Sequence, residues 1–473
     1  MKEFDSSLAT SKATEPKQFV PAELTRILGE HVVGFAASDL PGHTVGVTRA
    51  AIMDQVGVML AASSLAPNSL PFIEIARCAG EGQSAVIGHG FRSSALMAAF
   101  ANGAMAHALD FEDTHDPTLV HPHAPVVAAA LAVAEEQCAS GEDLLAAVAI
   151  GADLSCRLAL GFRGDPQSKG FLLQPTIGVF GATAAAARLL RLSVDQTIQA
   201  FALAFGQATQ STAVMTYDAS DIRAVRDGFN AKAGVLSALL ARAGLKAFDH
   251  PLEGPAGYYS LFTKDGYEEE TVLADLGLRF HGAEVSFKPW PCCRGAHAFV
   301  EAALSLGGSF PTSAIERIDV EVSPFFSVLC EPPAQRQRPS SPIAAKFSIP
   351  YSVAVALTNG DVTIDDFEPD RLSCSALLSL AALVHHRVDQ GRGTGGATSG
   401  SLTITLKSGQ TFSKDIAHPL GHPNNPISHA DLERKFLACA RYAAVPLQGR
   451  QLLEDLAARL STVDQLASIR DLF

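Results

Sequence analysis

Alanine- and leucine-rich segments, broken by glycine and proline, run from residue 21 to about residue 247 of this 473-residue chain. Their apolar residues recur with helical spacing, and capping residues mark helix starts. Ser140 with Asp143 and Ser193 with Gln196 have the spacing of a capping box, in which a hydroxyl accepts a free N–H and the third residue reaches back. Because alanine lets helix backbones approach closely, the region predicts a tightly packed all-α bundle.

The pattern changes after Lys288. Residues 315–322 (IERIDVEV) and 402–406 (LTITL) alternate apolar and polar side chains, as half-buried strands do. A tight turn then leads to a further strand at 411–416, and a capped helix at Ser428 restores the helical pattern to the end. The sequence therefore predicts a smaller α+β unit between two helical parts of the chain.

These patterns divide the chain into four parts. Its length exceeds the size at which one core usually stops growing, so two domains are expected. Residues 1–20 form a loose polar tail, residues 21–284 and 416–473 build the helical domain, and residues 285–415 form the inserted domain. The predicted fold is mainly α: a large all-α helical domain formed by both chain ends, with an inserted smaller α+β domain.

Composition disfavours several classes of function. The chain has 36 Lys and Arg against 49 Asp and Glu, a formal net charge of −13, which disfavours nucleic-acid and anionic-membrane surfaces. The longest apolar run, 124–134, is too short to span a bilayer, and the N-terminal residues lack the apolar core of a secretion signal. Eight scattered cysteines show neither a disulfide framework nor zinc spacing. A cytoplasmic protein with reduced thiols and no metal site is expected.

One short stretch concentrates ionisable residues. Residues 107–115 (HALDFEDTH), followed by 121–125 (HPHAP), place acids, imidazoles and a hydroxyl between two alanine-rich helical runs. At helix ends that face a cavity, burial and mutual charge shift the pKa values of such groups, which is typical of proton transfer. Helix capping by the Asp and Thr side chains is the alternative interpretation.

A second stretch combines positive charge with a helix start. Residues 288–297 (KPWPCCRGAH) carry Lys288, Arg294, two thiols and an imidazole, and prolines fix the backbone before a helix near Ala296. Two cations beside a helix N-terminus suit a carboxylate, which accepts charge-assisted hydrogen bonds. The alternative is a domain junction in which Trp290 and the cysteines are merely buried.

Three further segments are open to more than one interpretation. Arg223 and Arg226 lie three residues apart, so they either face one ligand or form solvated helix-face charge. Tyr351 is either a proton donor or a core residue with a satisfied hydroxyl. The glycines of 391–396 match a dinucleotide fingerprint but precede a strand instead of following one, so no cofactor is predicted.

Three motifs together resemble the MmgE/PrpD family, which contains 2-methylcitrate dehydratases, cis-aconitate decarboxylases and an iminodisuccinate epimerase. HALDFEDTH followed by HPHAP is similar to the family segment H-A-x-D-F-D-D-T-H…H-P-S-A-P. FKPWPCCRGAH is similar to K-P-Y-P-C-C-R-G-x-H, and KFSIPY to K-F-S-x-P-Y. Similarity at 178–190 and 418–436 extends the resemblance over nearly the whole chain.

The resemblance implies an inserted α+β lid domain, an active site between the lid and the helical domain, and a homodimer. By position, it also implies catalytic residues that supply an acid, a hydroxyl, an imidazole, a lysine at the lid boundary and a lid tyrosine: Asp110, Thr114, His121, Lys288 and Tyr351. Residues that hold the substrate or support the site are expected around them: Asp113, His115, Gln174, Arg223, Arg226, Cys293 and Arg294.

Two departures from the family pattern bear on the reaction. Many members have a histidine where this chain has Gln174, and a glutamine cannot transfer a proton near neutral pH. Where members often carry T-K-P-L-H, this chain reads I-R-A-V-R, so Arg223 replaces a possible acid/base lysine and stays protonated. These changes leave both substrate and reaction open.

The family chemistry removes a group beside a carboxylate, or replaces it with a proton, and this requires cations and a base at carbon. The predicted function is therefore a cofactor-independent lyase of a small di- or tricarboxylate, first of all a 2-methylcitrate dehydratase-like hydro-lyase. Lys288, Arg223 and Arg226 would hold the substrate carboxylates. His121 would take or return the proton at carbon, and Tyr351 would protonate the leaving hydroxyl. The alternatives are decarboxylation or epimerisation at the same site, and a non-catalytic carboxylate-binding protein.

Overall fold

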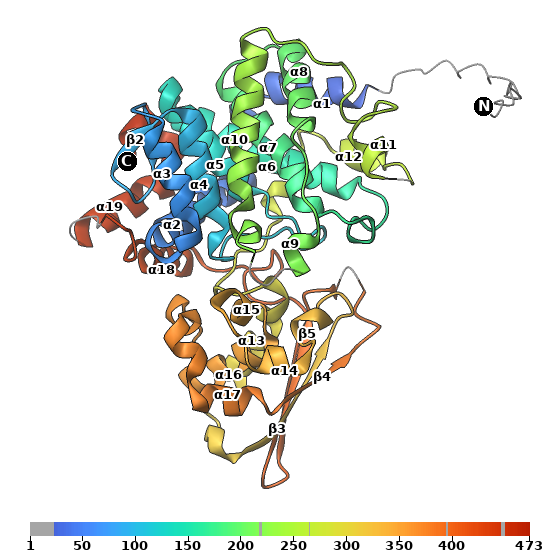
Figure 1. Ribbon diagram of the computed structural model, residues 1–473, viewed down its shortest axis with the longest axis vertical. Helices are drawn as coiled ribbons and strands as arrows, with labels where there is room; N and C mark the ends of the chain where they lie inside the picture. Colours follow the sequence, from blue (N-terminus) through green and yellow to red (C-terminus); the bar gives the residue numbers. More distant parts are fainter. Residues whose placement is uncertain (1–22, 217–219, 264, 394–395, 446–449) are drawn as a thin grey trace, which may run out of the picture.

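The computed structural model describes residues 23–473 except 217–219, 264, 394–395 and 446–449. Helices make up most of the described chain, and a small sheet lies near one end of the molecule (Figure 1), so the mainly α prediction is confirmed. The predicted tail, residues 1–20, lies outside the described residues.

The larger unit is built from helices that come from both ends of the chain (Figure 1). Its helices are α1 (Leu24–Gly34), α2 (Gly42–Leu65), α3 (Leu70–Cys78), α4 (Ala95–Ala108), α5 (His123–Gln137), α6 (Gly141–Leu160), α7 (Leu173–Leu189), α8 (Val194–Phe205), α9 (Ala213–Thr216), α10 (Ile222–Arg242), α11 (Tyr258–Phe262), α12 (Glu269–Leu273), α18 (His429–Ala440) and α19 (Arg450–Ser461). Both α18 and α19 pack on α2, so the C-terminal segment returns to the N-terminal helices.

Small residues set the spacing of this bundle, as the alanine content predicts. A Cβ on Gly103 of α4 would lie 2.6 Å from the carbonyl oxygen of Asp227 in α10. In the other direction, a Cβ on Gly228 of α10 would lie 2.7 Å from the carbonyl oxygen of Phe100. The two helices therefore meet at backbone distance, which fixes the side chains that α10 presents near the end of α4.

The larger unit also holds a two-stranded hairpin that the sequence analysis missed. Strand β1 (Ser84–Val86) pairs antiparallel with β2 (Phe91–Ser93). The prediction of a purely all-α domain is wrong to this extent. Strands of three residues are too short to show a two-residue alternation, which is why the pattern did not predict them.

The smaller unit packs helices against a four-stranded sheet. It contains α13 (His297–Leu306), α14 (Pro333–Gln337), α15 (Pro342–Lys346), α16 (Ile349–Asn359), α17 (Ser375–Ala381), β3 (Ile315–Val322), β4 (Val384–Val388), β5 (Gly400–Leu406) and β6 (Thr411–Ile416). The strand order is β4-β3-β5-β6, with β4 parallel to β3 and the other neighbours antiparallel. Strand β4 was not predicted, because its sequence VHHRV lacks a regular apolar alternation.

Buried apolar residues form two main cores. One draws on residues 24–283 and 436–472 together with Ile364, and the other on residues 290–416. Helix α2 alone is long and apolar enough, among the described helices, to cross a membrane, and 72% of its most apolar window is buried inside the protein. Packing in the first core therefore accounts for its apolar composition.

Candidate active site

The ionisable stretch is the connection between α4 and α5, next to the point where the chain passes into the smaller unit. Its backbone is pinned by a two-way bridge, in which the N–H of Thr114 donates to Ser286 and the N–H of Ser286 donates to Thr114, at 2.9 and 2.7 Å. This bridge holds the segment that leads to Lys288 against the connection. Asp110 adopts a left-handed backbone with φ of 52°, a conformation that Asp tolerates better than most residues.

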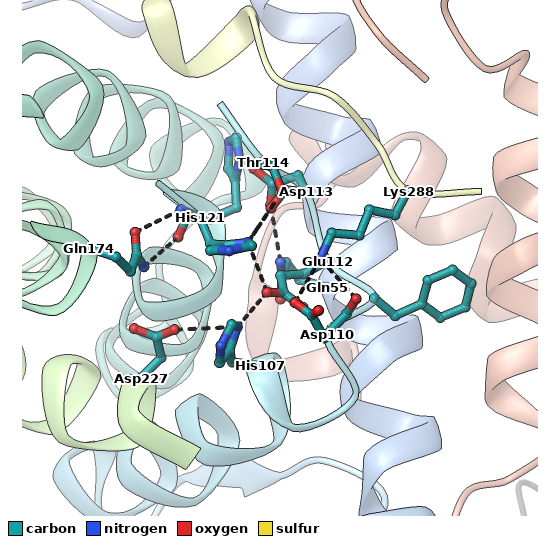
Figure 2. A network of polar contacts seen from close by, with 12 residues as sticks. Gln55, His107, Asp110, Glu112, Asp113, Thr114, His121, Gln174, Asp227 and Lys288 are labelled. Atoms are coloured by element: carbon teal, nitrogen blue, oxygen red, sulfur yellow. Dashed lines mark hydrogen bonds and ion pairs between the residues drawn. The ribbon is translucent and has the colours of Figure 1, made fainter. Parts of the chain in front are cut away.

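Asp110 and Lys288 form a buried ion pair (Figure 2). The Lys288 ammonium donates to the Asp110 carboxylate at 2.9 Å and to the Asp110 carbonyl oxygen at 2.8 Å, and the lysine is fully buried. Burial alone would raise the pKa of the Asp110 carboxyl, but the charges of Lys288, Arg223 and His107 together outweigh it and hold that pKa below its usual range. Burial likewise opposes the charge on Lys288, yet the carboxylates of Asp110 and Glu112 raise its pKa.

A second carboxylate, Glu112, lies between two imidazoles (Figure 2). Its Oε1 hydrogen bonds to Nδ1 of His107 and lies 3.0 Å from Nδ1 of His121. Asp227 of α10 approaches His107 from the other side, with 3.8 Å between its Oδ2 and the ring nitrogen. Burial would raise the pKa of Glu112, but His107, Lys288 and His121 hold it well below its usual value. Acid and imidazole therefore alternate in the order Asp227, His107, Glu112, His121.

His121 has one ring nitrogen surrounded by oxygen atoms. Besides Glu112, its Nδ1 lies 2.9 Å from the carbonyl oxygen of Asp113 and 3.4 Å from the hydroxyl of Thr114. A carbonyl only accepts, so this geometry favours a proton on Nδ1. In the neutral ring the lone pair then lies on Nε2, which is the nitrogen available as a base.

Two amide side chains and a third imidazole support this arrangement. The carboxylate of Asp113 accepts from Gln55 at 3.2 Å and meets Nδ1 of His123 at 2.8 Å, so it faces away from His121 while its carbonyl faces that ring. Gln174 contacts the backbone of His121 on both sides (Figure 2). Asp113 and Gln174 are therefore placed to position His121.

Three cations approach the cluster from other elements. Lys346, at the end of α15, donates to the carbonyl oxygen of Leu109 at 2.8 Å, and burial lowers its pKa to about 8. Arg223 and Arg226 lie in the first turns of α10, and Arg223 stacks over the ring of Phe347 at 3.8 Å. The Arg226 side chain is buried, and its charge, after burial itself, lowers the pKa of His107.

Three residues of the predicted site have other surroundings. Tyr351 lies in the core of the smaller unit, where its hydroxyl donates to the carbonyl oxygen of Asp366 at 2.9 Å. Arg294 pairs with Asp116 at 3.1 Å and donates to the carbonyl oxygens of residues 419 and 420. His115 bonds through Nδ1 to Thr118 at 2.7 Å. The structure therefore does not bring these side chains into hydrogen-bond contact with the described residues of the cluster.

These contacts favour a structural role for both Tyr351 and Arg294. Tyr351 is a core tyrosine whose hydroxyl is hydrogen bonded, and Arg294 lies at a domain junction. Cys293 is also buried, and burial raises the pKa of its thiol to about 11, so it is not a ready thiolate. Its backbone N–H donates to the carbonyl oxygen of Lys346 at 2.9 Å, which ties the junction to α15.

Sequence reasoning singled out the stretch that contains His107 and Glu112 but gave neither residue a role, and it did not place Lys346 or Lys435 in the site. Lys435 of α18 forms an ion pair with Asp54 of α2 and donates to the carbonyl oxygen of Phe111, each at 2.7 Å, and so anchors the connection from the C-terminal helices. Burial, the largest cause, raises the pKa of Asp54 to about 6 despite this lysine. No local pattern marks Lys435, because its partners lie far away in the chain.

The central cluster could in principle hold a metal ion. His107, Asp110, Glu112 and His121 each offer a ligand atom within 4.8 Å of the others. The ammonium of Lys288, however, already supplies positive charge directly at Asp110.

Comparison with known proteins decides the family. Residues 26–270 match the MmgE/PrpD N-terminal domain, and residues 290–459 match the MmgE/PrpD C-terminal domain. The chain belongs to the MmgE/PrpD family. Together the two matches cover most of the chain, so the resemblance seen in the motifs is confirmed over both of its structural units.

Relatives within the MmgE/PrpD family are named for one reaction. The cis-aconitate decarboxylase-like protein oryM of Aspergillus oryzae is 27% identical over 476 residues, covering 94% of this chain and 95% of the relative. Cis-aconitate decarboxylase of Aspergillus terreus is 28% identical and covers 74% of this chain and 76% of its own length. Human cis-aconitate decarboxylase is 28% identical over 72% of each chain. These lyases favour the decarboxylase alternative over the dehydratase that the sequence analysis put first.

Proposed function

We propose that this protein is a cofactor-independent decarboxylase of a small unsaturated tricarboxylate of the cis-aconitate type. One observation carries the proposal: a partly buried imidazole, His121, lies against the buried carboxylate of Glu112 in a cluster approached by four cations, Lys288, Lys346, Arg223 and Arg226. A tricarboxylate needs several cations, and one proton donor must lie beside them. The names of the relatives add support to this substrate class.

The proposed reaction moves one proton and one molecule of CO₂. In cis-aconitate, one carboxylate sits on a methylene group next to the carbon–carbon double bond. Cleavage of the bond to this carboxylate releases CO₂, and its electron pair forms a new double bond with the neighbouring carbon. The electrons of the old double bond then take a proton at the far carbon, which bears another carboxylate. Cations near that carboxylate stabilise the negative charge that develops there.

The residues of the cluster divide these tasks. Lys346, Arg223 and Arg226 hold carboxylates, because their charges come from two different elements around one place. Protonated His121 gives the proton to carbon through Nε2, while Glu112 and the Asp113 carbonyl hold its Nδ1. Lys288 forms an ion pair with Asp110 and favours the ionised form of that carboxyl group. Thr114 lies within reach of the same imidazole as a further oxygen partner.

Dehydration is the second candidate reaction, and the position of Tyr351 disfavours it. Removal of a hydroxyl requires an acid at the leaving oxygen, and Tyr351 was the predicted donor. Its hydroxyl instead donates to Asp366, and burial raises its pKa to about 12, which makes it a weak acid. Decarboxylation requires a single proton at carbon, so the cluster is sufficient for it.

Proton NMR in deuterated water tests the proposal. The purified protein is incubated with cis-aconitate, citrate, 2-methylcitrate and iminodisuccinate. We expect loss of CO₂ from cis-aconitate with one deuterium at the protonated carbon, and no new alkene from citrate or 2-methylcitrate. Dehydration of either hydroxy acid without decarboxylation would overturn the proposal in favour of the hydro-lyase. Exchange or inversion at iminodisuccinate alone would favour the epimerase, and binding without any turnover the non-catalytic protein.

Replacing His121 with Ala tests its role in the same assay. Loss of a general acid costs at least about a hundredfold in turnover. The matched control is His43→Ala, because His43 is an exposed residue of α2. Near-normal turnover of the His121 variant would remove this residue from the mechanism.

We further propose that residues 285–415 act as a lid and that the protein works as a cytoplasmic homodimer. The lid is supported by burial: Asp110, Glu112 and Lys288 are almost completely covered, so a substrate reaches them only when the two units move apart. Small-angle scattering with and without substrate tests the lid, with a smaller radius of gyration expected in the complex. Sedimentation velocity tests the dimer, which a single monomer boundary would contradict.

A further inference from the structure

A cavity of about 410 Å³ lies on the larger unit, near but separate from the cluster around His121. Its walls come from the end of α6, from α12 and from the segment that follows α12, and residues 115 and 117 close one side. Among the side chains that line it, His115, His281 and Glu284 form one group whose ligand atoms could hold a metal ion together. Their ligand atoms all lie within 4.8 Å of one another.

His115 presents a nitrogen that no described residue satisfies. The imidazole is fully buried, and its Nδ1 is bonded to the Thr118 hydroxyl at 2.7 Å. Its Nε2 is buried and has no hydrogen-bond partner within the described chain. When Nδ1 carries the proton and donates it to Thr118, the lone pair of the ring lies on Nε2. A buried, unsatisfied lone pair is costly unless a ligand uses it.

Hydrogen bonds to neighbouring residues hold the other two proposed ligands, His281 and Glu284, in place. The backbone N–H of His281 donates to Asp153 at 2.7 Å, and its ring lies 6.2 Å from the ring of His115. The Glu284 carboxylate lies 3.3 Å from Nδ1 of His281. Arg279 holds the same carboxylate through Nε and Nη2, at 2.6 and 2.8 Å. His115 and Glu284 therefore each have a side-chain partner of the kind that orients metal ligands, and His281 is held through its backbone.

We propose that His115, His281 and Glu284 form a binding site for a divalent transition-metal ion of the zinc class. Two imidazoles and one carboxylate are ligands that Zn²⁺ takes at about 2.0–2.2 Å. A contraction from the present spacing would bring all three to that distance, and water from the cavity would fill the fourth position. The Thr118 hydroxyl on Nδ1 of His115 leaves Nε2 as the coordinating atom.

Such an ion would join two segments that lead into the proposed active site. Thr114, next to His115, bonds to Ser286, which lies two residues after Glu284. His121 follows on one segment and Lys288 on the other. The metal site is therefore a structural tie beside the cluster, and it stands whether or not the proposed decarboxylation is correct.

Cobalt binding tests the site without any need for activity. The untagged full-length protein is stripped of metal with a chelator and titrated with Co²⁺, whose visible absorption reports four-coordinate binding. We expect one equivalent of Co²⁺ per chain, displaced by Zn²⁺. His281→Gln should weaken binding by more than the roughly 10- to 100-fold that loss of an outer partner costs, and Glu284→Gln should also weaken it. Circular dichroism of the metal-free variants checks that both are folded.

Two control variants separate this site from others that contain histidine. His121→Gln alters the cluster of the proposed active site, and His422→Gln alters the stacked His418–His422 pair, whose rings lie 4.4 Å apart. Both controls should keep the cobalt spectrum and its stoichiometry. The proposal is overturned by the absence of cobalt binding, by binding that survives both cavity variants, or by loss of the spectrum in either control.

Discussion

The side-chain amide of Gln174 holds both backbone polar groups of His121. Its Oε1 accepts the His121 N–H at 2.7 Å, and its Nε2 donates to the His121 carbonyl oxygen at 3.1 Å. The family pattern leads us to expect a histidine at this position. In this chain a glutamine, which cannot transfer a proton near neutral pH, fixes the backbone of His121 instead. The proton chemistry of the proposed site then falls to His121, and Gln174 determines where that imidazole lies.

Replacing Gln174 with Ala should lower turnover about thirtyfold, because the two hydrogen bonds are together worth about 2 kcal/mol and 1.4 kcal/mol corresponds to a factor of ten. The effect should fall mainly on kcat, since the amide contacts His121 instead of the carboxylate-binding cations. Steady-state kinetics of the variant checks this. Gln335→Ala is the matched control, because Gln335 is exposed; an equal loss in both variants would contradict the positioning role.

Replacing Lys288 with Met should destabilise the fold by about 3 kcal/mol, because it leaves the buried carboxylate of Asp110 without its partner. The double variant Lys288→Met with Asp110→Asn should recover most of this loss, since Asn is neutral and tolerates the left-handed backbone. Urea unfolding measures both. Lys169→Met, an exposed control, should change little. A double variant no more stable than the single one would contradict the ion pair.

The pH profile of kcat/KM should report Lys346. Burial lowers the pKa of this lysine to about 8, so its ammonium is present below that pH and is lost as the pH rises through it. Because the proposed substrate is anionic, kcat/KM should fall on the alkaline side of about pH 8. Lys346→Arg should remove this limb, since Arg stays protonated. An unchanged alkaline limb in the arginine variant would assign the titration to another group.

Replacing Gly228 with Ala should destabilise the bundle by about 1–3 kcal/mol, because the new methyl group would meet the Phe100 carbonyl oxygen at 2.7 Å and push α10 from α4. The same shift should displace Arg223 and Arg226, so turnover should fall as well. Thermal unfolding and kinetics check both effects. Gly46→Ala in α2 is the control: nothing lies within 4 Å of its Cβ, and the better helix propensity should leave stability equal or higher. Destabilisation by both changes would contradict the close-packing argument.

Periodicity and capping predicted the helical regions, several helix starts and three of the strands. The capping pair Ser193 and Gln196 forms a complete capping box, and Ser428 caps α18 as expected. Strand β3 occupies exactly the predicted 315–322, because one of its faces is buried and the other is not. The two short strands of the hairpin and the polar strand β4 were not predicted. Pairing with neighbouring strands, rather than their own residue pattern, makes these segments strands.

Motif spacing could identify the crowded connection after α4 but could not rank its acids. Glu112 and Asp113 are neighbours in an irregular segment, yet Glu112 meets His107 and His121 while Asp113 meets Gln55 and His123. Which carboxylate faces which imidazole depends on α2, α5 and α10, and these elements are distant in the chain.

The sequence by itself determined which regions are helical, where the longer alternating strands form, the family and the stretch in which acids and imidazoles gather, because these depend on local spacing and residue type. Only the tertiary structure decided the partners. In the folded protein Lys288 pairs with Asp110, and Lys346 donates to the carbonyl oxygen of Leu109. The Tyr351 hydroxyl donates to the carbonyl oxygen of Asp366, and His115 lines a cavity. The physical reason is that ion pairing and desolvation act through space over a few ångströms, and packing of distant segments alone sets those distances.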